Sequence, residues 1–232
     1  MNPWLMTVLM VAAWGTFFYS FYARIALLRS LAPEDRGGSL SERLRLLFDI
    51  GFGQRKLMRR RQERSSGAMH FFIFWGALIV GQRELILMGE GFVPGFQEWL
   101  PGLGAEDLLA YLYAFVYSTA EAIVLAMVAF ALWRRVRLRP RRLDLNWEGL
   151  YVLWFIAAIM ATDLVFDAAR INLVQQFGQP LHLLHSPVWG SEVEWMPFPA
   201  LLALLLAPLG EGANAFLYHF GYWGHVAVML TF

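Results

Sequence analysis

The stretch AMHFFIFWGALIVGQRELILMG, residues 68–89, decides the fold of this chain. It is apolar almost throughout, and Arg83 and Glu84 are its only permanently charged side chains. A bilayer core about 30 Å thick is crossed by about 20 residues of α-helix, at a rise of about 1.5 Å per residue. The stretch is therefore predicted to cross a membrane as a single helix.

Other parts of the chain repeat this pattern. We expect four more spans, at residues 1–28, 107–133, 147–169 and 212–232. A sixth apolar stretch, residues 198–209, is too short to cross and is bracketed by prolines, so we expect an interfacial or re-entrant segment. The predicted fold class is an all-α, polytopic membrane helical bundle with five transmembrane helices, forming a single membrane domain over residues 1–232.

The composition agrees with a membrane protein. Of the 232 residues, 58% are hydrophobic and 16% are charged, the net charge is +1, and the mean hydropathy is +0.48. These values exclude an ordinary water-soluble domain, a disordered tail and a nucleic-acid-binding protein. The chain has no cysteine, which excludes disulfides, thiolate nucleophiles and iron–sulfur clusters held by its own thiolates.

The distribution of basic residues predicts the orientation. Sixteen of the 19 lysines and arginines fall in residues 29–64, which hold ten, and in residues 134–142, which hold six. The positive-inside rule places both stretches in the cytoplasm, where they also contact membrane lipid. With five spans, the N-terminus lies outside and the C-terminus in the cytoplasm. We expect a multi-pass protein of the inner membrane of a bacterial or archaeal cell.

The first basic loop contains a predicted amphipathic helix. Ser39 and Glu42 have the spacing of a capping box, and Leu40, Leu44 and Phe48 follow on one helical face. The helix, at about residues 39–58, is therefore expected to lie on the inner leaflet of the membrane. The basic face of this segment is also a candidate docking surface for a soluble protein.

Three of the five histidines fall on predicted spans: His70, His219 and His225. Ionisable side chains within a membrane are costly and are therefore functional candidates. A haem between two antiparallel helices takes one imidazole from each, which makes His70 and His225 the candidate metal-ligating pair. His219 would serve a second, outer haem. The alternative is that these histidines only bind neighbouring helices by hydrogen bonds, and His182 and His185 are expected to be surface loop residues.

A second set of candidates consists of charged residues within the spans. Arg83 and Glu84, near one end of the second span, are expected to form a polar cluster with Asp163 and Asp167 of the fourth. Glu121 lies near the middle of the third span. Within a membrane, an arginine can pair with haem propionates, and charged groups can transfer protons to or from a quinone. The candidate catalytic residues are Asp163, Glu121 and Arg83. The alternative is a purely structural ion pair.

Three segments carry a family resemblance. They are Gly53-Gln54-Arg55-Lys56-Leu57, the run from Gly67 through His70 to Gly76, and Tyr222-Trp223-Gly224-His225. They resemble the membrane cytochrome b domain related to the nitrate reductase gamma subunit, in the form joined to cysteine-rich iron–sulfur modules. That form is found in membrane electron-transfer-flavoprotein:quinone oxidoreductases and in heterodisulfide reductase membrane subunits.

The resemblance implies a membrane subunit that passes electrons between a quinone or menaquinone pool and a cytoplasmic iron–sulfur protein or domain, through one or two b haems. An electron-transfer flavoprotein is a further candidate partner. His70 matches the inner histidine of the family, and His225 matches its histidine on the last span. Where the nitrate reductase gamma pattern has a second histidine on span two, this chain has Val80. We expect the natural polypeptide to continue beyond residue 232 into a cytoplasmic iron–sulfur domain.

Two other function classes stay open. A cofactor-free membrane anchor or assembly subunit of a respiratory complex predicts a colourless protein that tolerates loss of His70. A small-solute transporter would use Glu121 and Asp163 as a proton relay. The odd number of predicted spans and the lack of an inverted repeat disfavour the transporter.

Overall fold

The computed structural model describes most of the chain, and every element among the described residues is helical. The described residues are 2–32, 39–58, 64–93, 95–103, 108–138, 147–178 and 195–231. The long helices are α1 (Pro3–Arg29), α4 (Arg64–Phe92), α5 (Leu108–Trp133), α6 (Trp147–Gln175) and α8 (Glu211–Thr231). The short elements are α2 (Leu40–Leu46), π-helical η1 (Leu47–Phe52), α3 (Arg55–Met58), 3-10 helix η3 (Phe96–Trp99), π-helical η4 (Arg134–Leu138), α7 (Pro197–Leu206) and 3-10 helix η7 (Ala207–Leu209).

Within the described residues, four helices are long and apolar enough to cross a membrane: α1, α4, α5 with η4, and α6. They coincide with four of the five predicted spans and are consistent with a multi-pass membrane protein. The fifth also forms a helix, α8, but its 21 residues include Glu211, Asn214, His219 and His225, and it is not among these four. Its crossing of the membrane stays a prediction.

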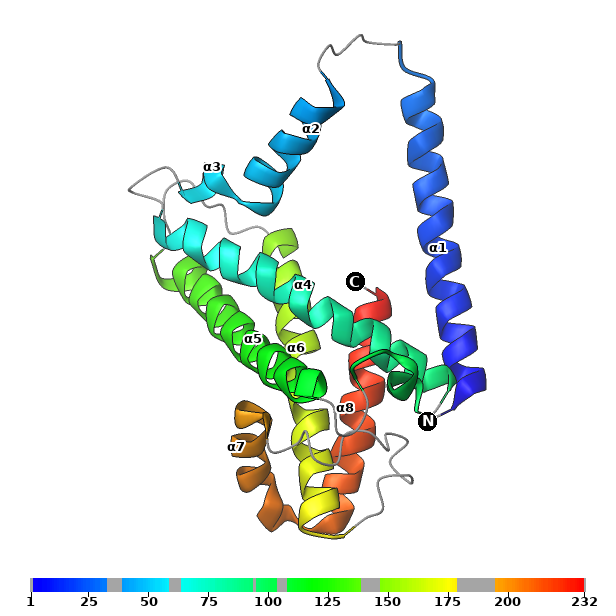
Figure 1. Ribbon diagram of the computed structural model, residues 1–232, viewed down its shortest axis with the longest axis vertical. Coiled ribbons are helices and arrows are strands. Elements are labelled where there is room, and N and C mark those ends of the chain that lie inside the picture. The colour runs from blue at the N-terminus through cyan, green and yellow to red at the C-terminus, as the bar shows by residue number, and fades with distance from the viewer. Residues whose placement is uncertain are drawn as a thin grey trace.

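The bundle consists of α4, α5, α6 and α8, with α7 packed on α6 (Figure 1). Helices α6 and α8 run side by side over most of their lengths, and so do α4 and α5. Helix α1 stands beside the bundle and joins its core at the N-terminal end, where Met6 packs with Leu87 and Tyr222. Farther along α1 the aromatic side chains, such as Phe18 and Tyr19, are exposed, which suits a helix surrounded by lipid.

The face that α8 turns toward α6 follows the helical period. Its buried residues recur three or four positions apart, and they are Asn214, Tyr218, Gly221, Tyr222, His225 and Val226. Gly221 makes the close approach possible, because a Cβ atom there would lie 2.8 Å from both the Cα and the backbone nitrogen of Phe166. Small residues serve this purpose at the contacts between membrane helices.

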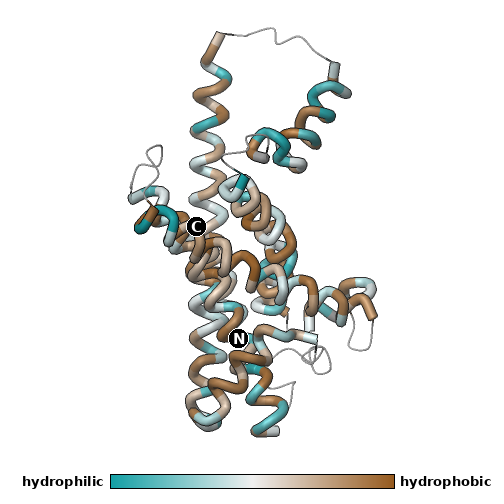
Figure 2. The backbone as a smooth tube through the Cα atoms, turned by 90° about the vertical axis from the view of Figure 1, so that its left-hand side faces the viewer, coloured by the Kyte–Doolittle hydropathy of each residue, from teal (hydrophilic) through white to brown (hydrophobic). Residues whose placement is uncertain are grey.

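The segment predicted to be amphipathic over residues 39–58 is helical in three pieces, α2, η1 and α3. The predicted capping box is present: Ser39 Oγ accepts from the Glu42 backbone nitrogen, and Glu42 Oε2 accepts from that of Ser39. Leu44 and Phe48 are exposed. Hydrophobic and hydrophilic residues alternate along this segment, whereas hydrophobic residues dominate the long helices (Figure 2).

The short apolar stretch 198–209 forms α7 and η7. Two asparagines fix its position: Asn172 of α6 donates to the Ala203 carbonyl (2.8 Å) and to Asn214 Oδ1 (2.9 Å). Asn214 in turn donates to the Gly210 carbonyl at 2.8 Å. Gly210, with φ of +81°, lets the chain reverse into α8. These bonds satisfy backbone groups that an apolar environment would leave unpaired.

The Gly221 contact predicts a position-specific cost of added volume. Gly221→Ala should lower the free energy of unfolding by about 1–3 kcal/mol, because the new methyl group forces α8 away from α6. Gly224→Ala is the matched control, since its Cβ would lie 3.5 Å from Thr162 Cγ2, an ordinary contact. Unfolding in mixed micelles, followed by circular dichroism, measures both. Equal stabilities of the two variants would contradict the close α6–α8 packing.

Candidate functional site

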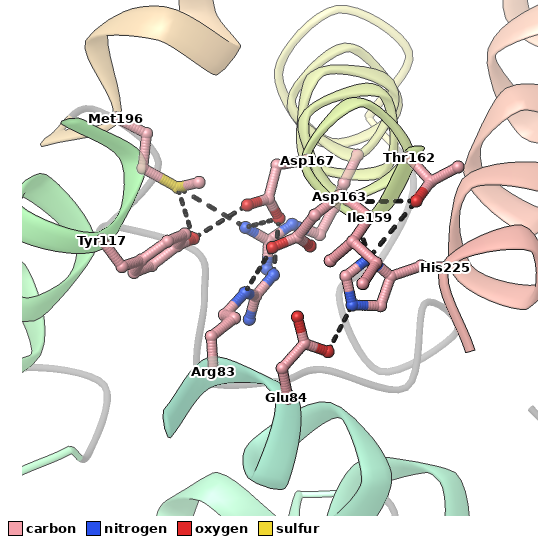
Figure 3. A network of polar contacts seen from close by, with 10 residues as sticks. Arg83, Glu84, Tyr117, Ile159, Thr162, Asp163, Asp167, Met196 and His225 are labelled. Carbon is pink, nitrogen blue, oxygen red and sulfur yellow. Dashed lines mark hydrogen bonds and ion pairs between the residues drawn. The ribbon is translucent and has the colours of Figure 1, made fainter. Parts of the chain in front are cut away.

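The centre of the bundle holds a buried ion cluster of Arg83, Tyr117, Asp163, Asp167 and Arg170. Figure 3 labels the first four of these residues. Arg83 Nη2 donates to Asp167 Oδ1 at 2.9 Å, and Arg170 Nη2 lies 3.0 Å from the same oxygen. The Tyr117 hydroxyl donates to Asp167 Oδ2 at 2.8 Å. Arg83 Nε lies 3.5 Å from Asp163 Oδ2. All five side chains are at most 1% exposed, so the charges interact without screening by bulk water.

The helical period explains how this cluster forms. Asp163 and Asp167 are four residues apart on α6, and Arg170 follows three residues later, which places all three on one face. Two aromatic rings enclose the arginines: the Arg83 guanidinium lies 4.8 Å from the centre of the Tyr117 ring, and that of Arg170 lies 5.8 Å from the Phe166 ring. Such cation–π contacts gain strength when the cation is desolvated.

Glu84 departs from the expected cluster. Arg83 joins Asp163 and Asp167 as predicted, but Glu84 contacts His225 of α8 instead, with 2.5 Å between Oε2 and Nε2. We expected one joint cluster, but consecutive residues on a helix point about 100° apart, so the two side chains face different neighbours. Arg83 therefore faces α5 and α6, and Glu84 faces α8.

His225 is fixed by its other ring nitrogen as well. Nδ1 lies 3.0 Å from the Ile159 carbonyl and 3.3 Å from Thr162 Oγ1. A carbonyl oxygen can only accept, so Nδ1 carries the proton and donates it to Ile159. Nε2 then faces Glu84. His225 is 1% exposed, and this structure uses both of its nitrogens within the bundle.

His70 lies in a different environment, near the first turns of α4. Its Nδ1 lies 3.1 Å from Gln54 Oε1, and an amide oxygen only accepts, so Nδ1 carries the proton and Nε2 is the nitrogen able to bind a metal. Gln54 is 4% exposed and has a φ of +49°, a left-handed conformation that is uncommon for residues other than glycine. The unusual backbone directs the Gln54 side chain inward to His70.

A cavity of about 360 Å³ adjoins His70. Apolar side chains of α4, α5 and α6 make most of its wall, and Arg134 and Arg135 of η4 also line it. Among the described residues that line the cavity, His70 is the only histidine. The arrangement offers one imidazole and two guanidinium groups to an occupant with an apolar body and anionic ends.

The structure does not bring His70 and His225 together. His225 contacts Glu84, and Glu84 lies 14 residues after His70 on α4, a separation of about 21 Å along the helix axis. His219 is exposed on α8, and its ring packs on Tyr218. In this structure the two histidines therefore do not face one common site, and their use as a ligand pair stays a prediction.

Glu121 is completely buried on α5, and neither of its carboxylate oxygens has a hydrogen-bond partner among the described residues. In the same part of the chain, no group of three or more His, Cys, Asp or Glu side chains could hold a metal ion. His182 and His185 lie outside the described residues.

Sequence reasoning assigned no role to four residues of these sites: Gln54, which it named only within a segment of the family resemblance, Tyr117, Arg134 and Arg135. Tyr117 had a usable signal, since it precedes Glu121 by four residues and so shares its helical face. The two arginines were counted only as topology signals. Gln54 owes its role to an unusual backbone conformation that hydropathy and spacing do not reveal.

Comparison with known proteins found two curated relatives of low identity. The chain is 23% identical over 231 residues to a probable iron-sulfur-binding oxidoreductase, FadF, of Bacillus subtilis, which aligns with 100% of this chain and 30% of the relative. It is 21% identical to the EtfAB:quinone oxidoreductase of Syntrophomonas wolfei, over 99% of this chain and 30% of that protein. The chain thus spans less than a third of the length of either relative. No protein-family model matches the chain, and no solved structure matches it.

The ion cluster predicts a strong dependence of stability on Asp167. Asp167→Asn should lower the free energy of unfolding by about 3 kcal/mol, because it removes the negative charge shared by two buried arginines. Asp49→Asn is the control, since Asp49 pairs with Arg55 on the surface, where ion pairs contribute little. Titration with sodium dodecyl sulfate measures both. Equal stability of Asp167→Asn and the parent protein would show that the cluster is unimportant for the fold.

Proposed function

We propose that the chain is the membrane subunit of an oxidoreductase, which passes electrons between a quinone and an iron–sulfur or flavoprotein partner through a b haem at His70. The geometry of His70 carries the proposal. Its Nδ1 is held by Gln54, its Nε2 is the nitrogen able to bind a metal, and a cavity with two arginines adjoins it. Metal-ligating histidines are usually oriented in this way by a hydrogen bond to the other ring nitrogen.

The cavity suits haem in its chemistry as well as in its ligand. Apolar side chains of α4, α5 and α6 would surround the macrocycle, and Arg134 and Arg135 would pair with the propionates. A haem held there would supply one-electron transfer. The chain itself orients His70 through Gln54 and lines the cavity with side chains of three long helices, α4, α5 and α6.

The names of the two relatives support the proposed redox partners. The Bacillus relative is named as an iron-sulfur-binding oxidoreductase, and the Syntrophomonas relative as an EtfAB:quinone oxidoreductase. The exposed basic residues near the cavity, such as Arg55 and Lys56 of α3 and Arg137 of η4, give this end a positive potential. That potential would attract an acidic soluble partner, and under the positive-inside rule this end faces the cytoplasm.

The first test is spectroscopic. The purified protein should show a haem b spectrum on reduction with dithionite and a measurable haem b content by pyridine haemochrome. His70→Ala should remove the haem, whereas His219→Ala, which changes an exposed histidine on α8, should retain it. His225→Ala should also retain the haem at His70, since the two histidines lie far apart.

A colourless, folded protein made with adequate haem supply would contradict the proposal and favour the cofactor-free membrane anchor as the function. Loss of all haem in a folded His225→Ala variant would instead show that one haem uses both histidines, contrary to the distance between them.

Gln54 gives a second, independent prediction. Gln54→Ala should weaken haem binding by roughly 10–100-fold, because the His70 imidazole loses the bond that fixes its orientation and protonation. Gln82→Ala, an exposed glutamine of α4, is the control and should bind haem as the parent does. Titration of apoprotein with haem measures all three affinities. An unchanged affinity in Gln54→Ala would mean that Gln54 does not support the ligand.

A further inference from the structure

Five carboxylate oxygens are buried between α4, α5, α6 and α8 without a hydrogen-bond partner among the described residues. They are Glu84 Oε1, both side-chain oxygens of Glu121 and both of Asp163. Glu121 and Asp163 are 0% exposed. A buried carboxylate oxygen without a hydrogen bond is strongly unfavourable unless it binds water or its carboxyl group is protonated.

The cluster around these oxygens has more acids than bases. Among the described residues, four carboxyl groups (Glu84, Glu121, Asp163 and Asp167) face two guanidinium groups (Arg83 and Arg170) and the imidazole of His225. Tyrosines complete the surroundings. They are Tyr113 and Tyr117 of α5 and Tyr218 of α8.

This imbalance implies a bound proton. If all four carboxyl groups were ionised, a negative charge would remain even with His225 protonated. An uncompensated charge in the apolar interior of a bundle is much less favourable than protonation. Among the described groups, the charge balance therefore favours at least one neutral carboxyl group.

The contacts indicate which carboxyl group holds the proton. Asp167 accepts hydrogen bonds from Arg83 and Tyr117, and such bonds stabilise the ionised form. Asp163 lies 3.5 Å from the Arg83 guanidinium, and Glu84 contacts His225. Glu121 has neither a hydrogen bond nor an ion pair to its carboxyl group among the described residues, and its side chain is completely buried. Complete burial without a partner favours a neutral Glu121.

We propose that Glu121 is the proton-holding residue of a buried site that supplies a proton for quinone reduction. This inference rests on the proposed function. Reduction of a quinone to a quinol consumes two electrons, which arrive from the redox partner, and two protons. Glu121 gives up one proton and becomes a carboxylate, and water supplies the other. Glu121 then regains its proton from water.

Infrared spectroscopy tests the bound proton directly. In lipid nanodiscs at neutral pH, the protein should show a carbonyl-stretch band of a protonated carboxylic acid that shifts on exchange into deuterated water. Glu121→Gln should remove intensity from this band, and Glu121→Asp should retain it. Glu148→Gln, which changes an exposed glutamate in the first turn of α6, should leave it unchanged. Identical bands in Glu121→Gln and the parent protein would overturn the proposal.

The second readout is the rate of quinone reduction by the protein reconstituted with its redox partner. Glu121→Gln should slow it on the order of 100-fold, as loss of a proton donor does, with haem content unchanged and part of the rate recovered in Glu121→Asp. A normal rate in Glu121→Gln would remove Glu121 from the reaction. The infrared band requires neither haem nor quinone, so a colourless protein that retains the Glu121 band would refute electron transfer while leaving the proton site intact.

Discussion

The pairing of Asp167 with Arg83 and Arg170 is the interaction on which the bundle depends. An isolated charge within a membrane helix is strongly unfavourable, so each arginine can be buried only where a carboxylate meets it. Arg83 comes from α4, Asp167 and Arg170 from α6, and Tyr117 from α5. Three helices are thus held in one register by the requirement that no buried charge stays unpaired, while contacts such as that of Gly221 with Phe166 set how closely α8 can follow.

The bundle separates two chemical environments along α4. Its first turns carry His70 beside an open cavity with arginines, where a redox group would meet a partner from the aqueous phase. About 21 Å farther along, Glu84 belongs to the buried interior of the bundle, where it contacts His225. Electron entry and proton supply would then occur at different depths, and the rigid helix α4 would fix the distance between them.

Hydropathy was enough to predict the helices, because in a membrane the backbone must satisfy its own hydrogen bonds. The capping box at Ser39 and the shared face of Asp163 and Asp167 also followed from spacing alone. The partners of individual side chains did not. Whether Glu84 faces Asp163 or His225 depends on how α4 is rotated against α6 and α8, which packing of the whole bundle decides. The inward position of Gln54 depends on a local left-handed backbone that its residue type does not favour.

The distance in sequence between Arg83 and Asp167 has a consequence for biosynthesis. The two residues are 84 positions apart, so the ribosome completes α4 well before the carboxylate that neutralises Arg83 exists. During that interval α4 must enter the membrane with an arginine near one end of the span, at a cost of up to about 2.5–3.5 kcal/mol, the value for the centre of an inserting helix. The favourable insertion free energy of the apolar residues on either side of Arg83 has to outweigh this cost. The hydrophobicity of α4 is therefore set by the order of translation as well as by the finished fold.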